Sequence, residues 1–234
     1  MKLALLTAGG VGSRMKQEVP KQFIHVNDKP IIIYSLEAFQ KHPDIDVIAV
    51  ACLDGWANVL AAYARQYHIT KLKHIVPAGE TGQESIRNGL IEFEKYYNSE
   101  DIVLVHDGVR PMLSQDVISD CIVATEKYGC GIASIPTAEA ILYSEDSSSS
   151  NEFYDRTKLQ RTQTPHGFSL GHLSDLHRQA ESKGITNTVA SCTLAIELGE
   201  EVHFSLGSEK NLKVTTMEDL DIFKALLLSE ESKK

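Results

Sequence analysis

The first 130 residues alternate between short apolar runs and longer segments of helical length. The apolar runs fit buried strands, and the segments between them fit helices that connect parallel strands. This alternation predicts an α/β fold, with a single Rossmann-like, mostly parallel sheet and helices on both faces. Pro30 fits the first turn of a helix that begins at Ile31, with Asp28 as a candidate cap. Strands are expected at 3–6, 47–53 and 102–105, and helices at 31–41, 56–66, 84–96 and 114–127.

The alternation breaks between residues 137 and 163. Here the polar stretch Ser144–Asn151 has short apolar flanks, Ile141–Tyr143 and Phe153–Tyr154. We interpret residues 137–163 as a protruding β-arm, although a serine-rich stretch of this composition fits a flexible loop equally well. An arm with these flanks would carry an exposed apolar ribbon, which predicts that it joins two copies of the chain in a homodimer.

The last third of the sequence returns to mixed structure. A helix is expected at 172–182 and a strand near 202–206. Thr216 and Asp219 have the spacing of a capping box, so a C-terminal helix is predicted through Leu228. No linker or internal repeat divides the sequence, and residues 1–234 are therefore expected to form one domain with the arm at 137–163.

Composition excludes several classes of function. With 23 basic and 32 acidic residues the formal charge is −9, which disfavours a nucleic-acid partner and requires any phosphate site to be built locally. The four cysteines lie far apart without zinc-site spacing, and they suit a reducing compartment. The sequence begins with a strand-like run and has no stretch long enough to span a membrane, so we expect a cytoplasmic protein.

A glycine-rich turn follows the first predicted strand. Residues 6–15 read LTAGGVGSRM, and Pro20-Lys21-Gln22 comes shortly after. Glycines let backbone N–H groups approach phosphate oxygens, and Arg14 and Lys21 add positive charge, so the turn predicts a nucleotide site unless it is only structural. It is not a dinucleotide fingerprint, since Met15 replaces the third glycine, and it lacks the Gly-Lys-Ser/Thr ending of a P-loop.

A polar cluster follows the strand predicted at 102–105. Ligands of open α/β sheets bind just beyond the carboxyl ends of the strands, where His106-Asp107-Gly108-Val109-Arg110-Pro111 stands. Asp107 has the chemistry to hold a metal or a substrate hydroxyl, and Arg110 to grip a phosphate. The alternative is an Asp–Arg ion pair that shapes a tight turn. We expect His106 to be structural.

Two further segments carry weaker signals. The polar turn from Gly79 to the helix start near Ser85 could hydrogen-bond a base or ribose, or be only a helix cap. Lys213 lies between Leu212 and Val214 in a strand-like stretch, and is expected to point opposite to them, toward a cleft. Taken alone, a lysine at such a position is more often solvated.

Taken in order, these motifs resemble the CTP-dependent cytidylyltransferases that act on 2-C-methyl-D-erythritol 4-phosphate and on ribitol 5-phosphate. The resemblance covers nearly the whole chain, including RTQTP at 161–165 and NLKVTTMEDL at 211–220. It implies a nucleotidyltransferase that moves CMP from CTP to a sugar-alcohol phosphate, ribitol 5-phosphate being favoured, and releases pyrophosphate. The other acceptor, methylerythritol phosphate, and a non-catalytic nucleotide-binding paralogue remain as alternatives. A dinucleotide-dependent oxidoreductase is disfavoured by Met15 and Lys21.

The resemblance also implies roles for individual residues. Mg²⁺ is expected to bridge triphosphate oxygens, with Asp107 as its one candidate protein ligand. The homodimer would exchange its arms, so that Arg156 reaches the partner subunit's site. The implied catalytic residues are Arg14, Lys21 and Lys213; CTP would contact Ala8, Gly9, Gly10, Gly12, Gly79 and Ser85; the acceptor would contact Asp107, Gly108, Arg110, Arg156 and Thr164.

Three departures from the family pattern concern the acceptor. Relatives usually carry an Asp-Thr pair where Glu139-Ala140 stands, a Thr-Asp pair where Val189-Ala190 stands, and an arginine near Gly82. These changes leave the CTP residues intact. Val109 in HDGVRP is closer to the ribitol-phosphate branch than to the HDAARP of the methylerythritol branch.

Overall fold

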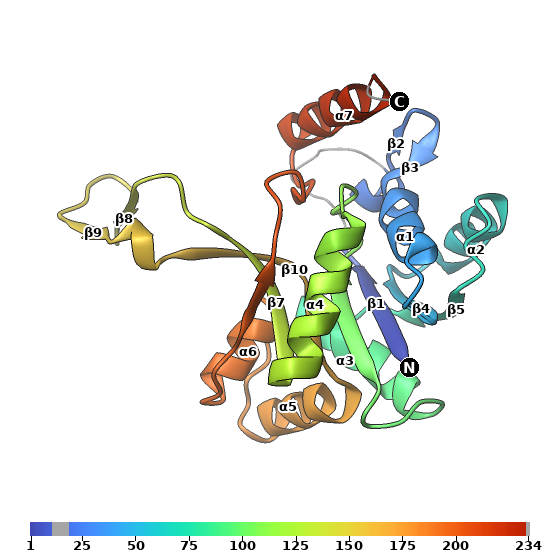
Figure 1. The fold of residues 1–234 in the computed structure, drawn as a ribbon, viewed down its shortest axis with the longest axis horizontal. Coiled ribbons are helices and arrows are strands. Elements are labelled where there is room, and N and C mark those ends of the chain that lie inside the picture. Colours follow the sequence, from blue (N-terminus) through green and yellow to red (C-terminus); the bar gives the residue numbers. More distant parts are fainter. Residues whose placement is uncertain (11–18, 233–234) are drawn as a thin grey trace.

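The computed structural model describes residues 1–10 and 19–232, and in this part of the chain a seven-stranded sheet forms the centre of the molecule (Figure 1). The strand order is β11-β7-β10-β6-β1-β4-β5, and β10 runs antiparallel to both of its neighbours while the other pairs are parallel. The predicted mostly parallel α/β sheet is confirmed. The strands are β1 Lys2–Ala8, β4 Val47–Cys52, β5 Leu72–Pro77, β6 Ile102–Asp107, β7 Cys130–Pro136, β10 Gln160–Ser169 and β11 Phe204–Leu206.

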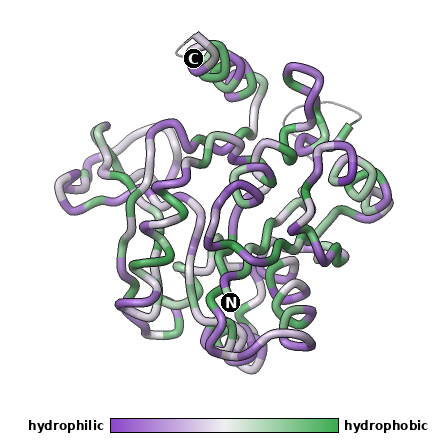
Figure 2. The backbone as a smooth tube through the Cα atoms, turned by 45° about the vertical axis from the view of Figure 1, so that its right-hand side comes forward, coloured by the Kyte–Doolittle hydropathy of each residue, from purple (hydrophilic) through white to green (hydrophobic). Residues whose placement is uncertain are grey.

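Helices cover both faces of this sheet. Alternate side chains of β1 enter different cores: Ala4 and Leu6 pack beneath α1, α2 and α4, whereas Leu3 and Leu5 pack beneath α3, α5 and α6. The chain ends in α7, at one extremity of the molecule, where hydrophilic and hydrophobic residues alternate (Figure 2). The helices are α1 Ile31–Lys41, α2 Ala57–Gln66, α3 Gly82–Glu94, α4 Gln115–Tyr128, α5 Leu170–Ser182, α6 Ser191–Glu197 and α7 Met217–Glu231.

Two predicted helix starts have different outcomes. The capping box is confirmed: Thr216 Oγ1 accepts from the Asp219 N–H at 3.2 Å, and Asp219 Oδ2 accepts from the Thr216 N–H at 2.9 Å. The prediction that Asp28 caps α1 is wrong. Pro30 holds the N-cap position without a side-chain bond, and Asp28, with φ +60°, lies in the turn between β2 (His25–Val26) and β3 (Lys29–Pro30). The position of Asp28 is set by this turn and not by capping of α1.

The segment predicted as an arm projects from the sheet (Figure 1). Its tip is a hairpin of β8 (Ile141–Tyr143) and β9 (Glu152–Tyr154), so this segment is a β-arm. Its apolar side chains face solvent; Leu142 is 63% exposed and Phe153 75%. Residues 160–163 already belong to β10, and the arm therefore continues directly into a strand of the central sheet.

None of the helices formed by residues 1–10 and 19–232 is both long enough and apolar enough to cross a membrane.

The packing of helix α4 depends on close contact between this helix and the sheet. Gly131 of β7 and Gly167 of β10 are paired in register beneath α4. A Cβ at Gly131 would lie 2.6 Å from the Cys121 carbonyl oxygen, and one at Gly167 would overlap Thr125 Oγ1. The missing side chains let α4 approach the sheet at its antiparallel strand.

We expect Gly167→Ala to destabilise the protein by about 1–3 kcal/mol, because the added methyl group must displace α4 from a packed position. Gly82→Ala is the matched control, since a Cβ at Gly82 meets nothing within 4 Å. Urea unfolding of both variants measures the free energies of unfolding. Equal unfolding midpoints for the two would show that α4 accommodates the methyl group without strain.

Candidate active site

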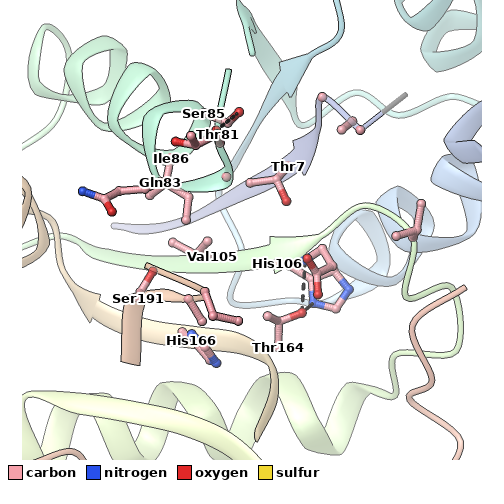
Figure 3. Close-up of a pocket in the computed structure, with 18 of the residues that line it drawn as sticks. Thr7, Thr81, Gln83, Ser85, Ile86, Val105, His106, Thr164, His166 and Ser191 are labelled. Atoms are coloured by element: carbon pink, nitrogen blue, oxygen red, sulfur yellow. Dashed lines mark hydrogen bonds between the residues drawn. The ribbon is translucent and has the colours of Figure 1, made fainter. Parts of the chain in front are cut away.

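A pocket of about 340 Å³ opens where β1 and β6 end (Figure 3). Thr7 and Ala8 come from β1, His106 and Asp107 from β6, and Thr164 from β10, which reaches this edge because it runs in the opposite direction. The start of α3 and the start of α6 complete the wall. The pocket brings together these predicted residues: Ala8, Gly9, Gly10, Lys21, Gly79, Ser85, Asp107, Arg110, Thr164 and Lys213.

Asp107 is bound by two cations within the pocket. Its Oδ2 accepts from Arg110 Nε at 2.9 Å, and its Oδ1 accepts from Lys213 Nζ at 2.9 Å. Burial alone would raise the pKa of the Asp107 carboxyl, but the charges of Lys213 and Arg110 hold that pKa well below its usual range. Asp107 is therefore ionised at neutral pH, and it orients two side chains that retain one net positive charge.

Thr164 hydrogen-bonds to the backbone of Asp107 and to the side chain of His106. Thr164 Oγ1 accepts from the Asp107 N–H at 3.0 Å and lies 3.0 Å from His106 Nδ1, whereas His106 Nε2 lies 3.3 Å from the Arg110 carbonyl oxygen (Figure 3). A carbonyl can only accept, so these partners favour a proton on Nε2. Burial lowers the pKa of His106 to about 4. His106 is thus a neutral, structural residue, as expected from the sequence.

The glycine turn meets Lys21 at one wall of the pocket. A Cβ at Gly10 would lie 3.5 Å from Lys21 Cε and 4.0 Å from its Nζ, so the lysine amine lies beside the turn. Gln22 fixes this arrangement, because its Nε2 donates to the Ala8 carbonyl oxygen at 2.8 Å. Gly12 and Arg14 lie outside the described residues.

The turn before α3 is held by its own hydrogen bonds. Ser85 Oγ accepts from the Gly79 N–H at 3.0 Å and donates to the Thr81 carbonyl oxygen at 2.9 Å. Thr81 Oγ1 caps α3 by accepting from the Glu84 N–H at 3.1 Å. The helix cap is therefore confirmed; the turn also lines the pocket, and its contact with a base or ribose stays a prediction.

Two predicted residues lie apart from this pocket wall. The N–H of Gly108 donates to the Thr7 carbonyl oxygen at 2.9 Å, which places Gly108 behind the wall. Arg156 lies on the arm in the short turn Arg156–Lys158, and its Nη1 donates to the Ala138 carbonyl oxygen at 2.8 Å. Arg156 therefore does not line the pocket of its own chain.

Gln83 is a pocket residue that sequence reasoning missed. Its Nε2 donates to the Ile185 carbonyl oxygen at 2.7 Å, and its Oε1 accepts from the Thr188 N–H at 2.9 Å. These bonds hold the loop that brings Val189 and Ala190 to the pocket. The only signal in the sequence was the position of Gln83 immediately before the helix predicted at 84–96, because its hydrogen-bond partners are about a hundred residues away.

The acidic residues of the pocket do not form a metal cage. Across residues 1–10 and 19–232, no group of three or more His, Cys, Asp and Glu side chains is arranged to hold a metal ion. Both carboxylate oxygens of Asp107 already accept from cations. The geometry therefore favours Asp107 as an organiser of Arg110 and Lys213 over Asp107 as a metal ligand.

Comparison with known proteins gives the family. Residues 2–229 match the family described as IspD, 2-C-methyl-D-erythritol 4-phosphate cytidylyltransferase. A ribitol-5-phosphate cytidylyltransferase of Lacticaseibacillus paracasei is 40% identical over 99% of this chain and 100% of its own. A 2-C-methyl-D-erythritol 4-phosphate cytidylyltransferase of Clostridium acetobutylicum is 36% identical over 97% of both chains.

A solved structure shows the same fold. The 4-diphosphocytidyl-2C-methyl-D-erythritol synthase of Anaerococcus prevotii superimposes with a TM-score of 0.82 over 97% of this chain and 96% of its own, at 22% sequence identity. The family match and the full-length relatives agree with the order of motifs in the sequence. The chain therefore belongs to the IspD family of cytidylyltransferases.

Proposed function

We propose that this protein transfers CMP from CTP to ribitol 5-phosphate, releasing pyrophosphate and forming a CDP-alditol. The observation that carries the proposal is the convergence of Lys21, Lys213 and Arg110 on one pocket at the carboxyl ends of parallel strands. The similarity to ribitol-5-phosphate cytidylyltransferases along the whole chain supports this acceptor. Methylerythritol phosphate is the second candidate, because relatives named for it also match over nearly the full length.

The reaction is an in-line displacement at phosphorus. An oxygen of the acceptor phosphate forms a bond to the α-phosphorus of CTP, and the bond to the bridging oxygen breaks with the electron pair leaving on pyrophosphate. A phosphate dianion is already a competent nucleophile, so no general base is required, in keeping with a neutral His106. The protein's task is to bring two polyanions together and to stabilise the charge that develops between them.

The positions of the described cations support that role. Lys21 lies beside the glycine turn, and Lys213, which also lines the pocket, is held by Asp107. We propose that these lysines flank the α-phosphate, with Arg110 and Thr164 toward the acceptor and with Gly12 and Arg14 completing the phosphate loop. Mg²⁺ would be held mainly by the triphosphate oxygens, where it neutralises charge.

We further propose that the protein is a cytoplasmic homodimer joined through the arm. The exposed apolar side chains of β8 and β9 would be covered by the second copy. Arg156, which lies away from its own pocket, would then reach the partner's pocket. The four cysteines are all buried and unpaired, which suits a reducing compartment.

The proposal is tested by incubating the protein with CTP, Mg²⁺ and a panel of polyol phosphates, with pyrophosphate release as the readout. Ribitol 5-phosphate should give the highest kcat/KM. A preference for methylerythritol phosphate would move the protein to the second candidate function. Binding of CTP without turnover of any acceptor would instead identify a non-catalytic paralogue.

We expect CTP to be preferred over UTP by roughly tenfold to a hundredfold, because one base-reading hydrogen bond left unpaired costs about 1–3 kcal/mol. The pocket near Gly79 and Ser85 should also exclude the larger purines of ATP and GTP. Competition assays with all four nucleotides at a fixed acceptor concentration measure this preference. Equal kcat/KM for UTP and CTP would remove the assignment of this wall to the base.

We expect Lys21→Ala and Lys213→Ala each to lower kcat on the order of a hundredfold to a thousandfold, about 3–4 kcal/mol, while CTP affinity changes less. Charge gathers at the α-phosphorus only when the acceptor arrives, and the phosphate loop still holds CTP. Arginine should not restore either rate fully, because its planar group is not a compact ammonium.

Lys210→Ala is the matched control for both lysines, since Lys210 pairs with Glu230 on the surface three residues before Lys213. Steady-state kinetics with a saturating acceptor and calorimetry with CTP separate rate from affinity. Near-wild-type turnover in either lysine variant would make that lysine an ordinary solvated side chain.

We expect light scattering to give a dimer at micromolar concentration. Replacing Leu142 and Phe153 together by serine should shift the protein toward monomer, because it removes exposed apolar surface from the arm. Deleting Ser144–Asn151 is the control, since this polar tip is expected to contribute little to the interface. A monomeric wild-type protein under these conditions would refute the proposed assembly.

A further inference from the structure

Lys213 lies on backbone that has no regular secondary structure. Residues 207–215 connect β11 to α7, and the side chain of Lys213 is 44% exposed. A lysine on such a segment is preorganised only if its backbone is fixed from both sides. The downstream side is fixed by the Val214 N–H, which donates to the Val109 carbonyl oxygen at 2.9 Å, and by the full burial of the Val214 side chain.

Asn211 fixes the upstream side. Its side chain is fully buried, and its Nδ2 donates to the Thr164 carbonyl oxygen at 2.8 Å. The backbone carbonyl oxygen of Asn211 accepts from Arg110 Nη1 at 2.8 Å. Asn211 thus contacts the strand that carries Thr164 and the arginine that binds Asp107, although it does not line the pocket itself.

Stability alone is a poor explanation for an amide at this position. Within the described residues, Asn211 Oδ1 is buried and has no hydrogen-bond partner. A buried polar atom without a partner costs about 1–3 kcal/mol, a cost that an apolar side chain of similar size would avoid. The contribution of Asn211 is therefore its specific connection between Thr164 and the segment of Lys213.

Gln163 adds a second anchor on the same segment. Its Nε2 donates to the Ser208 carbonyl oxygen at 2.9 Å, and its Oε1 accepts from the Ser208 N–H at 3.0 Å. The segment can approach β7 and β10 this closely because residue 207 is glycine; a Cβ there would lie 2.5 Å from the Ser134 carbonyl oxygen and 2.9 Å from Gln163 Oε1. Two side-chain amides, from neighbouring strand and segment, thus fasten residues 208–211 to β10.

We propose that Asn211, assisted by Gln163, is a positioning residue that sets Lys213 relative to Thr164 in the transition state. The inference rests on the proposed function of Lys213. It assigns to β10 a role beyond the proposed contact of Thr164 with the acceptor, since this strand holds the segment that carries Lys213. Asn211 acts on the reacting phosphate only through these neighbours.

The test is a double-mutant cycle. Asn211→Ala should lower kcat about tenfold to a hundredfold, the effect expected of a misplacement near 1 Å, with the Kd for CTP changed less than about threefold. In the Lys213→Ala background the same substitution should lower the residual kcat by less than about threefold, because the group that it positions is gone. Equal fold losses in both backgrounds would overturn the proposal.

Two further variants distinguish a loss of positioning from general damage to the fold. Gln163→Met removes both bonds to Ser208 at similar volume, and it should lower kcat by about threefold to tenfold, again only when Lys213 is present. Gln115→Ala is the control, since the Gln115 amide also donates to a backbone carbonyl, that of Ala38 at 2.9 Å, outside the pocket. It should leave kcat unchanged.

Failure of the proposed function gives a different result. A wild-type protein without turnover of CTP and any polyol phosphate would remove the reaction itself. If instead the wild type is active with either acceptor and urea unfolding shows each variant folded under assay conditions, additive losses in the cycle count against Asn211 alone.

Discussion

The active-site arrangement depends on one carboxylate shared by two cations. Asp107 is the last residue of β6, at the edge of the sheet where the parallel strands end. Its ion pairs with Arg110 and Lys213 connect that edge to a segment about a hundred residues later in the sequence. Within a protein of formal charge −9, the two cations exceed the carboxylate between them by one positive charge. The shared carboxylate orients the cations, while their excess charge remains available to substrates. The pocket is thereby a local reversal of the protein's overall charge.

Two structural halves meet at this carboxylate. Strands β1, β4, β5 and β6 form the parallel half, and the ends of β1 and β6 lead into the glycine turn and the Asp107 cluster. The other half consists of β7, β10 and β11. It contains the antiparallel strand β10 with Thr164, and a hydrogen bond from Asn211 to Thr164 attaches the segment of Lys213 to it. The departures at Val189-Ala190 lie on the pocket wall, whereas Glu139-Ala140 lies on the arm. Two of the three departures from the family pattern therefore lie outside the parallel half.

The sequence predicted what depends on local pattern. Strands β1, β4 and β6 are apolar runs buried on both faces, and the phosphate turn and HDGVRP follow them directly, so their place in the fold could be inferred. Strand β10 was missed because QRTQTPHGFS is polar and contains proline, and its pairing is fixed by distant strands. The roles of Gln83 and Asn211 were invisible for the same reason: both depend on hydrogen bonds across many residues. Asp28 was misassigned because a hairpin turn overrides its capping preference.

The continuity of the arm with β10 has a thermodynamic consequence. The returning chain of the arm becomes β10 at Gln160, and Thr164 follows four residues later on the same strand. In the proposed dimer, fixing the arm against a second copy also restricts the strand that forms the acceptor wall. Assembly and acceptor binding then share a coupling free energy, and linkage requires that it act equally in both directions. In such a dimer, a ligand that restricts β10 would stabilise assembly by the same factor by which assembly tightens the binding of that ligand.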